Sequence, residues 1–394
     1  MTEGVLSGIC VLDFGRFVAG PFGAALLGDL GADVIRIERP GGGEDRHLYP
    51  GTEAQEGALF LQMNRNKRSL ALDLKAPEAP DIMRRLVERS GVVIANLPEA
   101  GLRDLGLDYA SLRRIREDVI LTAISAFGKT GPYAAKVGFD SMGQAMSGSA
   151  YLSGFDVPTK SYASWVDLAT AAFAAFGTLA AIHERSRSGQ GQEVGASLLA
   201  SALTVMNFPL IEEALAGVGR GRKGNQGQSG GPADIFQADD GWIAVQVISD
   251  PIFRRWARLM GEPCWLEDAR FASDAARAVN ADPLSARMAE WCRTRSVEDA
   301  LTELAAARIP AAPVLSPAEV LAHPQMETGG FFEAMDYPGA PRPAPLVLKA
   351  VEMSATPPRL HTRAPMAGEH TEQILAELGF TPKEVEGLRS RAVI

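Results

Sequence analysis

Cysteine is scarce in this sequence. Only three occur among 394 residues, namely Cys10, Cys264 and Cys292. They form no CxxC pair, and no histidine lies close to any of them in the sequence. A disulfide framework and a zinc site are therefore disfavoured, and we expect no bound metal and a reducing, cytoplasmic location.

An excess of positive charge is also missing. The formal net charge is -9 at pH 7, which argues against nonspecific nucleic-acid binding, although a local basic patch can still bind an anionic ligand. With 46% hydrophobic and 22% charged residues, the composition excludes a disordered or fibrous class. The length exceeds that of a typical single core and predicts two domains or three.

Signal-peptide features are absent from the N-terminal stretch MTEGVLSGICVLDFG, which has neither a basic region nor a long apolar region. The longest apolar run, SWVDLATAAFAAFGTLAAI at residues 164–182, carries one acid, Asp167, near its start and ends before His183 and Glu184. It predicts a buried helix and not a membrane span, so we expect no membrane partner.

The first 125 residues alternate between strand-like and helix-like segments. Strands are predicted at 8–14, 32–38, 69–74, 92–97 and 119–125, and helices at 20–31, 76–91 and 107–117. This alternation predicts an α/β fold with a parallel, helix-covered sheet. The irregular, glycine-rich and serine-rich stretch at 128–154 that follows is predicted to be a functional loop.

Three segments are predicted to make up the domains. Residues 1–218 form the first part of a large domain, which includes a helix from near Asp167 to a stop at Gly189. Residues 219–325 form a small α+β domain: GRGRKGNQGQSGGP is a boundary or mobile loop, two strands follow around an Asp-Asp-Gly turn, and helices lie near 250–260, 282–294 and 297–307. Residues 326–394 return to the large domain and contain two short helices.

Nucleotide-binding motifs are weak in this chain. Gly15, Gly20 and Gly23 follow the first strand with GxxxxGxxG spacing rather than GxGxxG, although Glu38 stands where a ribose-binding acid would. The GKT at 128–130 lacks the first glycine of a phosphate loop. Basic residues cluster at predicted strand ends and could bind phosphates or form a solvated surface; they are Arg36, Arg39, Arg65, Lys67 and Arg68.

Asp167 has two compatible interpretations. An Asp before an apolar helical run is ordinarily an N-cap that accepts backbone N–H bonds. The helix dipole would also hold the carboxylate ionised, which suits a nucleophile. His183 lies roughly 24 Å further along one straight helix, and the other histidines show no triad spacing, so serine-histidine catalysis has little support.

Several stretches in this order resemble the family III CoA-transferases, the CaiB/BaiF group. They include VLDFGRFVAGPFGAALLGDLGADVIRIERPGGGED, NRNKRSLALDLK, SAFGKTGPY, GFDSMGQAMSG, VDLATAAFAAFGTLAAIHERSRSGQGQEVGASL and GEHTEQILAELG. The resemblance implies an interlocked homodimer in which each subunit has a Rossmann-like large domain, built from both chain ends, and a smaller domain between. It also implies that no cofactor is permanently bound, because a coenzyme A thioester is the substrate.

In this family an Asp matching Asp167 attacks an acyl-CoA thioester. The acyl-aspartyl anhydride then reacts with the departing thiolate to give an enzyme-CoA thioester, from which CoA passes to an acceptor carboxylate. The resemblance assigns CoA contacts to Val18, Ala19, Arg39, Arg65, Asn66, Lys67, Arg68, Asn96, Leu97 and Arg103. At 95–101 the chain reads ANLPEAG where the family has ENFRPG, and the family's following arginine falls on Asp104, next to Arg103.

Single positions favour CoA transfer over related reactions. Racemases of this family carry a His at the position of Phe139, and a phenyl ring cannot move protons. Formyl-CoA transferases carry a Gln at the position of Val18. Phe139 and Asp140 are predicted to shape the acyl pocket, with core packing as the alternative role of Phe139. Gly230 and Gly231 are predicted to belong to a loop that closes over the intermediate.

We therefore expect a CoA-transferase that takes CoA from an acyl-CoA such as succinyl-CoA to a small carboxylic acid, with itaconate, mesaconate and malate as candidate acceptors. The alternatives are an acyl-CoA racemase or isomerase and a non-catalytic CoA-binding homologue.

Overall fold

The computed structural model describes residues 4–49, 56–348 and 350–394 and divides into two compact units. The large unit comprises Met1–Ser147, Ser161–Ile211 and Gly329–Ile394, and the small unit comprises Gly148–Lys160 and Glu212–Thr328. Both chain ends therefore belong to the large unit. Residues 1–3, the start of the stretch examined for a signal peptide, lie outside the described residues.

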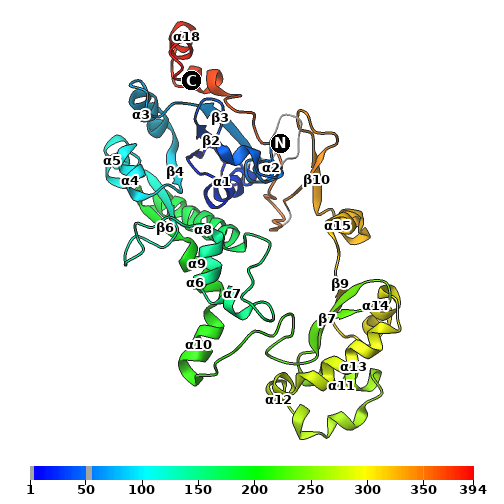
Figure 1. Ribbon diagram of the computed structural model, residues 1–394. Coiled ribbons are helices and arrows are strands. Elements are labelled where there is room, and N and C mark those ends of the chain that lie inside the picture. The colour runs from blue at the N-terminus through cyan, green and yellow to red at the C-terminus, as the bar shows by residue number, and fades with distance from the viewer. Residues whose placement is uncertain (1–3, 50–55, 349) are drawn as a thin grey trace. The chain divides into compact units, whose positions relative to one another are not determined.

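A six-stranded parallel sheet forms the centre of the large unit, with the strand order β3-β2-β1-β4-β5-β6 (Figure 1). In this order the strands are Lys67–Ala71, Asp33–Glu38, Cys10–Asp13, Gly91–Ala95, Ile120–Ser125 and Glu193–Ser197. In the register, Leu12 of β1 lies opposite Ile35 of β2 and Val93 of β4. The predicted mixed α/β class with a parallel sheet is confirmed, although β3 starts two residues earlier than predicted and β6 was not predicted.

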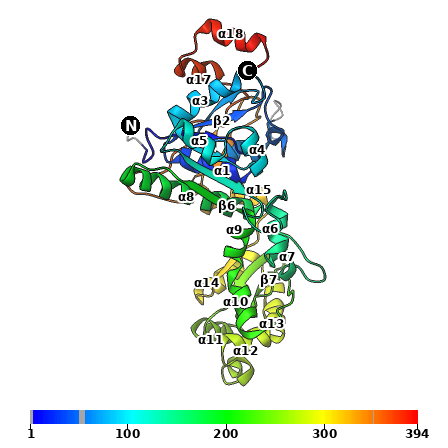
Figure 2. The same ribbon diagram turned by 90° about the vertical axis from the view of Figure 1, so that its left-hand side faces the viewer.

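Helices cover both faces of this sheet, as the alternation of buried side chains requires. Leu12 and Val93 pack into a core with the first set of helices, α3 (Ala79–Ser90), α5 (Tyr109–Ile115), α17 (Thr371–Glu377) and α18 (Pro382–Ser390). Val11 and Val92 face the opposite core with α1 (Ala19–Asp29), α8 (Trp165–Ser188) and α9 (Leu198–Val205). Figure 2 shows α3 and α17 above the strands and α8 below them. The two C-terminal helices thus pack on the large unit, as predicted.

Helix α8 is the element formed by the apolar run. By length and composition it is the one single helix of the described residues that could cross a membrane, and α9 with α10 (Asn207–Ala216) passes the same test as a pair bent by 65°. In this fold α8 packs against α1, and a Cβ at Gly23 would lie 3.2 Å from the carbonyl oxygen of Ala171. Small residues on both helices therefore permit close approach, and Gly189, with φ 74°, ends α8 as predicted.

Short elements complete the large unit. The stretch predicted to be an irregular loop contains helix α6 (Asp140–Met146) within the large unit and α7 (Ser149–Leu152) in the small unit. The remaining helices and strands of the large unit are η1 (Glu44–His47), α2 (Ala58–Met63), α4 (Glu99–Asp104), β10 (Phe332–Met335) and β11 (Ala344–Val347).

The small unit has a three-stranded antiparallel sheet in the order β7-β8-β9, formed by Ala233–Gln237, Trp242–Gln246 and Ala311–Pro313. Its core surrounds the fully buried Trp256. Besides α7 and the end of α10, its helices are α11 (Asp250–Leu259), η2 (Pro263–Leu266), η3 (Ala269–Phe271), α12 (Asp274–Val279), α13 (Ala281–Arg293), α14 (Val297–Ala306), α15 (Pro317–Ala322) and α16 (Pro324–Thr328).

The unit boundaries differ from the predicted domains at residues 148–160, 212–218 and 326–328, which group with the small unit. For the first two ranges the cause is local packing of the glycine-rich segment. Arg222 donates to the carbonyl oxygens of Tyr151 and Phe155, and Arg220 forms an ion pair with Glu212. Both contacts join sequence that precedes residue 219 to the segment after it.

Candidate active site

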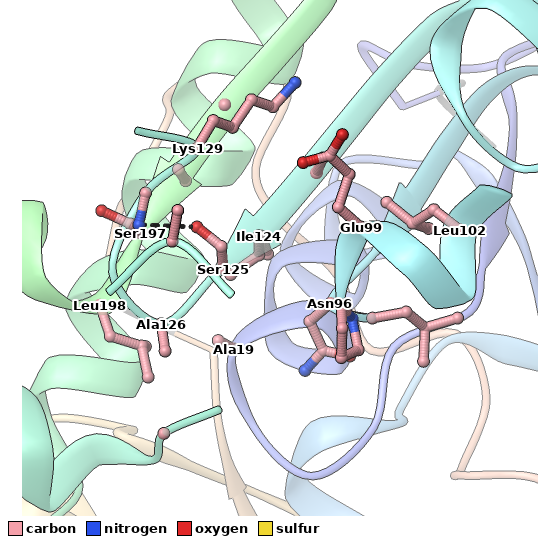
Figure 3. A pocket seen from close by; sticks show the side chains of 18 of the residues that line it. Ala19, Asn96, Glu99, Leu102, Ile124, Ser125, Ala126, Lys129, Ser197 and Leu198 are labelled. Carbon is pink, nitrogen blue, oxygen red and sulfur yellow. Dashed lines mark hydrogen bonds between the residues drawn. The ribbon is translucent and has the colours of Figure 1, made fainter. Parts of the chain in front are cut away.

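A cavity of about 1120 Å³ opens in the large unit at the carboxyl ends of β1, β4, β5 and β6. Its walls come from the segments that follow these strands. Figure 3 shows Asn96, Glu99 and Leu102 on one side and Ser125, Ser197 and Lys129 on the other, with Ala19 between them. In open parallel sheets, ligands bind at this edge, where the strand order reverses.

The reversal of strand order lies between β1 and β4, and the loops after these two strands are bonded to each other. The amide of Arg16 donates to Asn96 Oδ1 at 2.8 Å, and Asn96 Nδ2 donates to the carbonyl oxygen of Arg16 at 2.7 Å. Asn96, predicted to contact CoA, lines the cavity, but its amide group is committed to this reciprocal pair. It therefore fixes the shape of the crevice.

Asp167 is the third residue of α8 and lines the cavity. The interpretation of Asp167 as the N-cap is wrong: Ser164 stands at that position and makes no side-chain cap bond. Instead Asp140, the first residue of α6, accepts hydrogen bonds at Oδ1 from the amides of Val166 at 2.7 Å and of Asp167 at 3.1 Å. A second helix thus supplies the cap and leaves the Asp167 carboxylate free.

The Asp167 carboxylate accepts no hydrogen bond from the part of the chain that the structure describes. Burial, and then the charge of Asp140, raise its pKa to about 7. Near neutral pH a carboxylate in this state is partly ionised and poorly solvated. Poor solvation makes it a better nucleophile than an exposed carboxylate.

Two aromatic rings lie in the cavity wall with Asp167. Phe17 and Phe139 meet edge to face with their ring centroids 5.7 Å apart. Phe17 has φ 64°, a left-handed conformation that is costly for a bulky residue, and its amide donates to Asp45 Oδ2 at 3.2 Å. Sequence reasoning singled out Phe139 but missed Phe17, because the two rings are 122 positions apart and meet only in the fold.

Four cationic side chains line the cavity, and three of them already have a carboxylate partner. Arg16 pairs with Glu44, Arg103 with Glu99 and Lys129 with Glu193. The ammonium of the exposed Lys136 lies 3.5 Å from the centre of the Tyr133 ring. Arg103 was predicted from the sequence, whereas Arg16, Lys129 and Lys136 were not. The sequence did contain an indication for the two lysines, because both lie in the segment 128–154 that was predicted to be a functional loop.

Most of the predicted basic cluster lies outside the cavity, in buried ion pairs within the protein. Lys67 Nζ lies 2.7 Å from Asp13 Oδ2, and Arg65 Nη2 lies 2.6 Å from Asp29 Oδ2. The remaining pairs are Arg36 with Asp45 at 2.8 Å and Arg68 with Asp33 at 2.5 Å. The solvated-surface interpretation is wrong for Arg36, Arg65 and Lys67, which are buried, whereas the Arg68 pair is partly exposed. Phosphate contact by any of these side chains would require breaking pairs that are already formed.

The other predicted CoA-binding residues have varied positions. Ala19 and Leu97 line the cavity, whereas the neighbouring Val18 is buried and does not. Asn66 is buried and bonds to Asp29, and Arg39 is exposed and donates to the carbonyl oxygen of Gly42.

Three further predicted residues are also placed by the structure. Glu38, considered as a ribose-binding acid, is instead buried and bonded to Arg46. Gly230 and Gly231 belong to the small unit. Among the described residues no three His, Cys, Asp or Glu side chains group as metal ligands.

Asp140 does not line the cavity and is only 8% exposed. Its second oxygen, Oδ2, accepts from Gln144 Nε2 at 2.5 Å, so both carboxylate oxygens are engaged. The prediction that Asp140 shapes the acyl pocket is therefore corrected: its side chain is directed to the first turn of α8.

Fold and site together define an α/β enzyme of the doubly wound class. Four cations line its large crevice, and among the described residues that line it Asp167 has the one carboxylate with neither a hydrogen bond nor an ion pair. The chain belongs to CoA-transferase family III, whose family model matches residues 6–371. It is accordingly a CoA-transferase.

Individual relatives match nearly the whole chain. A protein named succinyl-CoA–D-citramalate CoA-transferase from Chloroflexus aurantiacus is 33% identical, with 99% of this chain and 98% of the relative covered. A succinate–glutarate CoA-transferase from Agrobacterium fabrum is 34% identical, with 95% of both covered. The crystal structure of a CaiB/BaiF family protein from Brucella suis has a TM-score of 0.84 at 32% identity, with 96% of this chain and 100% of that chain covered.

Proposed function

We propose that the protein transfers CoA from succinyl-CoA to a second small carboxylic acid, with Asp167 as the covalent nucleophile. The observation that carries this proposal is the free Asp167 carboxylate in the cavity wall, with its pKa raised to about 7. Succinyl-CoA as the donor is supported by the name of the Chloroflexus aurantiacus relative. The acceptor is a carboxylic acid of the same size range, for which itaconate, mesaconate and malate remain candidates.

The reaction divides one difficult exchange into steps that each form and break one bond. An Asp167 oxygen attacks the thioester carbonyl carbon, the C–S bond breaks, and CoA leaves as a thiolate. The thiolate then attacks the aspartyl carbonyl of the resulting anhydride, which releases succinate and leaves CoA on Asp167 as a thioester. The acceptor carboxylate attacks the carbonyl carbon of that thioester, the C–S bond breaks, and a second anhydride forms as CoA leaves as a thiolate. The thiolate finally attacks the acceptor carbonyl of this anhydride, which gives the new acyl-CoA and restores the Asp167 carboxylate. No proton is gained or lost over the cycle.

We assign CoA to the crevice between the loops after β1 and β4. Ala19, Leu97 and Arg103 line it. Lys136, which forms no ion pair with a carboxylate of the described residues, is a candidate for the CoA phosphates. We propose that Phe17 and Phe139 face the acyl group. Closure of the loop at Gly230 and Gly231 over the intermediate, and CoA contacts by Val18, Arg39, Asn66 and the buried cations, stay predictions.

The covalent intermediate provides the test. After incubation of the purified protein with succinyl-CoA alone, intact-mass measurement should show an adduct of CoA less one water, which hydroxylamine removes. Addition of an acceptor acid should discharge the adduct and yield a new acyl-CoA. Absence of an adduct with a broad panel of acyl-CoAs would contradict the proposal. Exchange of the acyl α-proton in deuterated water without acceptor would favour the racemase alternative.

We also propose that the protein is an interlocked homodimer in the cytoplasm. Large apolar side chains on α8 and on α10 are exposed in the isolated chain, including Phe176 at 72% and Phe208 at 75%, which is unusual for a monomer surface. Native mass spectrometry should give twice the 41.9 kDa chain mass, and a monomer at micromolar concentration would contradict the assignment. The free thiols of all three cysteines accord with a reducing compartment.

A further inference from the structure

We infer that Asp140 is a positioning residue for the nucleophile: it occupies the backbone donors at the start of α8, so that the Asp167 carboxylate cannot fold back onto them. This inference rests on the proposed role of Asp167. It assigns to Asp140 a function in presenting the nucleophile, in place of contact with the acyl group.

The competition arises from helix geometry. The first N–H groups of a helix have no partner within the helix, and an acid in the first turn is a natural acceptor for them. Asp167 stands in the first turn, where its carboxylate could accept such bonds. A carboxylate that does so is stabilised and turned away from the cavity, and both effects weaken it as a nucleophile.

Asp140 removes this competition with one oxygen. Its Oδ1 accepts from the amides of Val166 and Asp167, and Gln144 Nε2 holds the other oxygen. Gln144 is 1% exposed, and its own Oε1 accepts from the amide of Ser161 at 2.8 Å. The Asp140 carboxylate is thus fixed by a buried amide that is itself fixed by backbone.

No other acid takes part from the described elements that pack on α8. Strand β5 and helix α9 contain no titratable side chain, and α6 contains only Asp140. Helix α1 contributes only Asp29, which pairs with Arg65, and β6 contributes only Glu193, which pairs with Lys129. On α8 itself the other charged groups, from His183 onward, are at the far end of the helix. The cations that line the cavity are Arg16, Arg103, Lys129 and Lys136.

Asp140 affects Asp167 in two ways, through its negative charge and through its hydrogen bonds to the amides of α8, and two substitutions separate these effects. Asp140→Asn keeps an oxygen acceptor for the two amides but removes the negative charge, so Asp167 should ionise at lower pH and the acid limb of kcat/KM should move down with it. Asp140→Ala also frees the amides, so the Asp167 carboxylate should turn to them and kcat should fall on the order of tenfold to hundredfold.

Gln144→Ala is the matched control. It removes the same Gln144–Asp140 hydrogen bond that the Asn substitution disturbs, but keeps the Asp140 charge and its bonds to α8. Its pH profile should keep the wild-type position. A purely structural role for Asp140 would instead lower activity in Asp140→Asn and Gln144→Ala alike without moving either profile.

The experiment is a carboxyl-carbon NMR titration of Asp167 in the full-length protein, with the signal identified by its loss in Asp167→Asn, alongside the pH dependence of kcat/KM. Asp140→Asn and Asp140→Ala both remove the charge, and only Asp140→Ala frees the two amides of α8. A lower midpoint and a lower kcat in Asp140→Ala than in Asp140→Asn, with the wild-type midpoint in Gln144→Ala, support the inference. Equal midpoints and equal kcat in Asp140→Asn and Asp140→Ala overturn it. Because the titration needs no turnover, absence of a CoA adduct in the wild type would refute the proposed function separately.

Discussion

Asp167→Asn should abolish the CoA adduct and lower the rate of CoA transfer by at least about a thousandfold, because a neutral amide cannot attack a thioester. The asparagine side chain is nearly isosteric, and the carboxylate that it replaces has no hydrogen-bond partner among the described residues, so the packing of α8 is retained. The measurements are intact mass after incubation with succinyl-CoA and chromatographic assay of the product acyl-CoA. Wild-type adduct formation in this variant would show that another residue is the nucleophile.

The free energy of unfolding provides a control that Asp167→Asn remains folded. The pKa of Asp167 is about 7 in the folded protein against 3.8 for an ordinary aspartate. Between these values the folded state binds more protons than the unfolded state, so this group makes stability fall as pH rises, and above pH 7 the full cost is present. At about 1.4 kcal/mol per pKa unit, that cost is at most roughly 4 kcal/mol. Urea unfolding should therefore show Asp167→Asn to be more stable than the wild type at pH 8, with the difference vanishing toward pH 3.

Lys67→Ala should destabilise the protein by about 3–5 kcal/mol, because it leaves the Asp13 carboxylate buried without its counter-ion. Both side chains of this pair are 0% exposed. Lys67 Nζ also donates to the carbonyl oxygen of Pro21 at 2.7 Å and to Asn64 Oδ1 at 2.9 Å. The variant thus removes a side chain that connects β1, β3 and the first turn of α1. The loss of stability is measured as the change in the free energy of unfolding by urea.

Arg68→Ala is the matched control for Lys67→Ala. Arg68 also comes from β3 and pairs with Asp33 on a neighbouring strand and with Glu377 of α17, but both pairs are partly exposed to solvent. Its loss should cost about 0–1 kcal/mol. If Lys67→Ala instead keeps its stability and raises KM for succinyl-CoA, the residue contacts CoA phosphate, as the family resemblance predicted.

The sheet was predictable because apolar strands and amphipathic helices alternate with clear stops, such as Gly91 at the end of α3, where φ is 70°. Strand β6 was missed because EVGAS is short, partly polar and at the sheet edge. Helix α6 was missed because glycine and serine in GFDSMGQAMSG indicate a loop, whereas packing against α8 and α9 makes part of it helical.

Some residues of the candidate site could likewise be predicted from the sequence, and others could not. Asp167 could be singled out because a single acid within an apolar run is evident from the sequence alone. Its relation to Asp140 could not, since the two residues are 27 positions apart and meet only when α6 packs on α8. The basic cluster misled because a sequence shows cations but not the buried acids, such as Asp13 and Asp29, with which they pair.

The reciprocal amide pair between Arg16 and Asn96 has a consequence for the speed of recognition. Two loops that are already cross-linked by hydrogen bonds keep their conformational entropy low before any thioester arrives. Less of the intrinsic binding energy is then consumed in ordering the walls of the crevice. The loops after β1 and β4 are therefore already ordered when CoA arrives, so binding requires no slow folding of these loops.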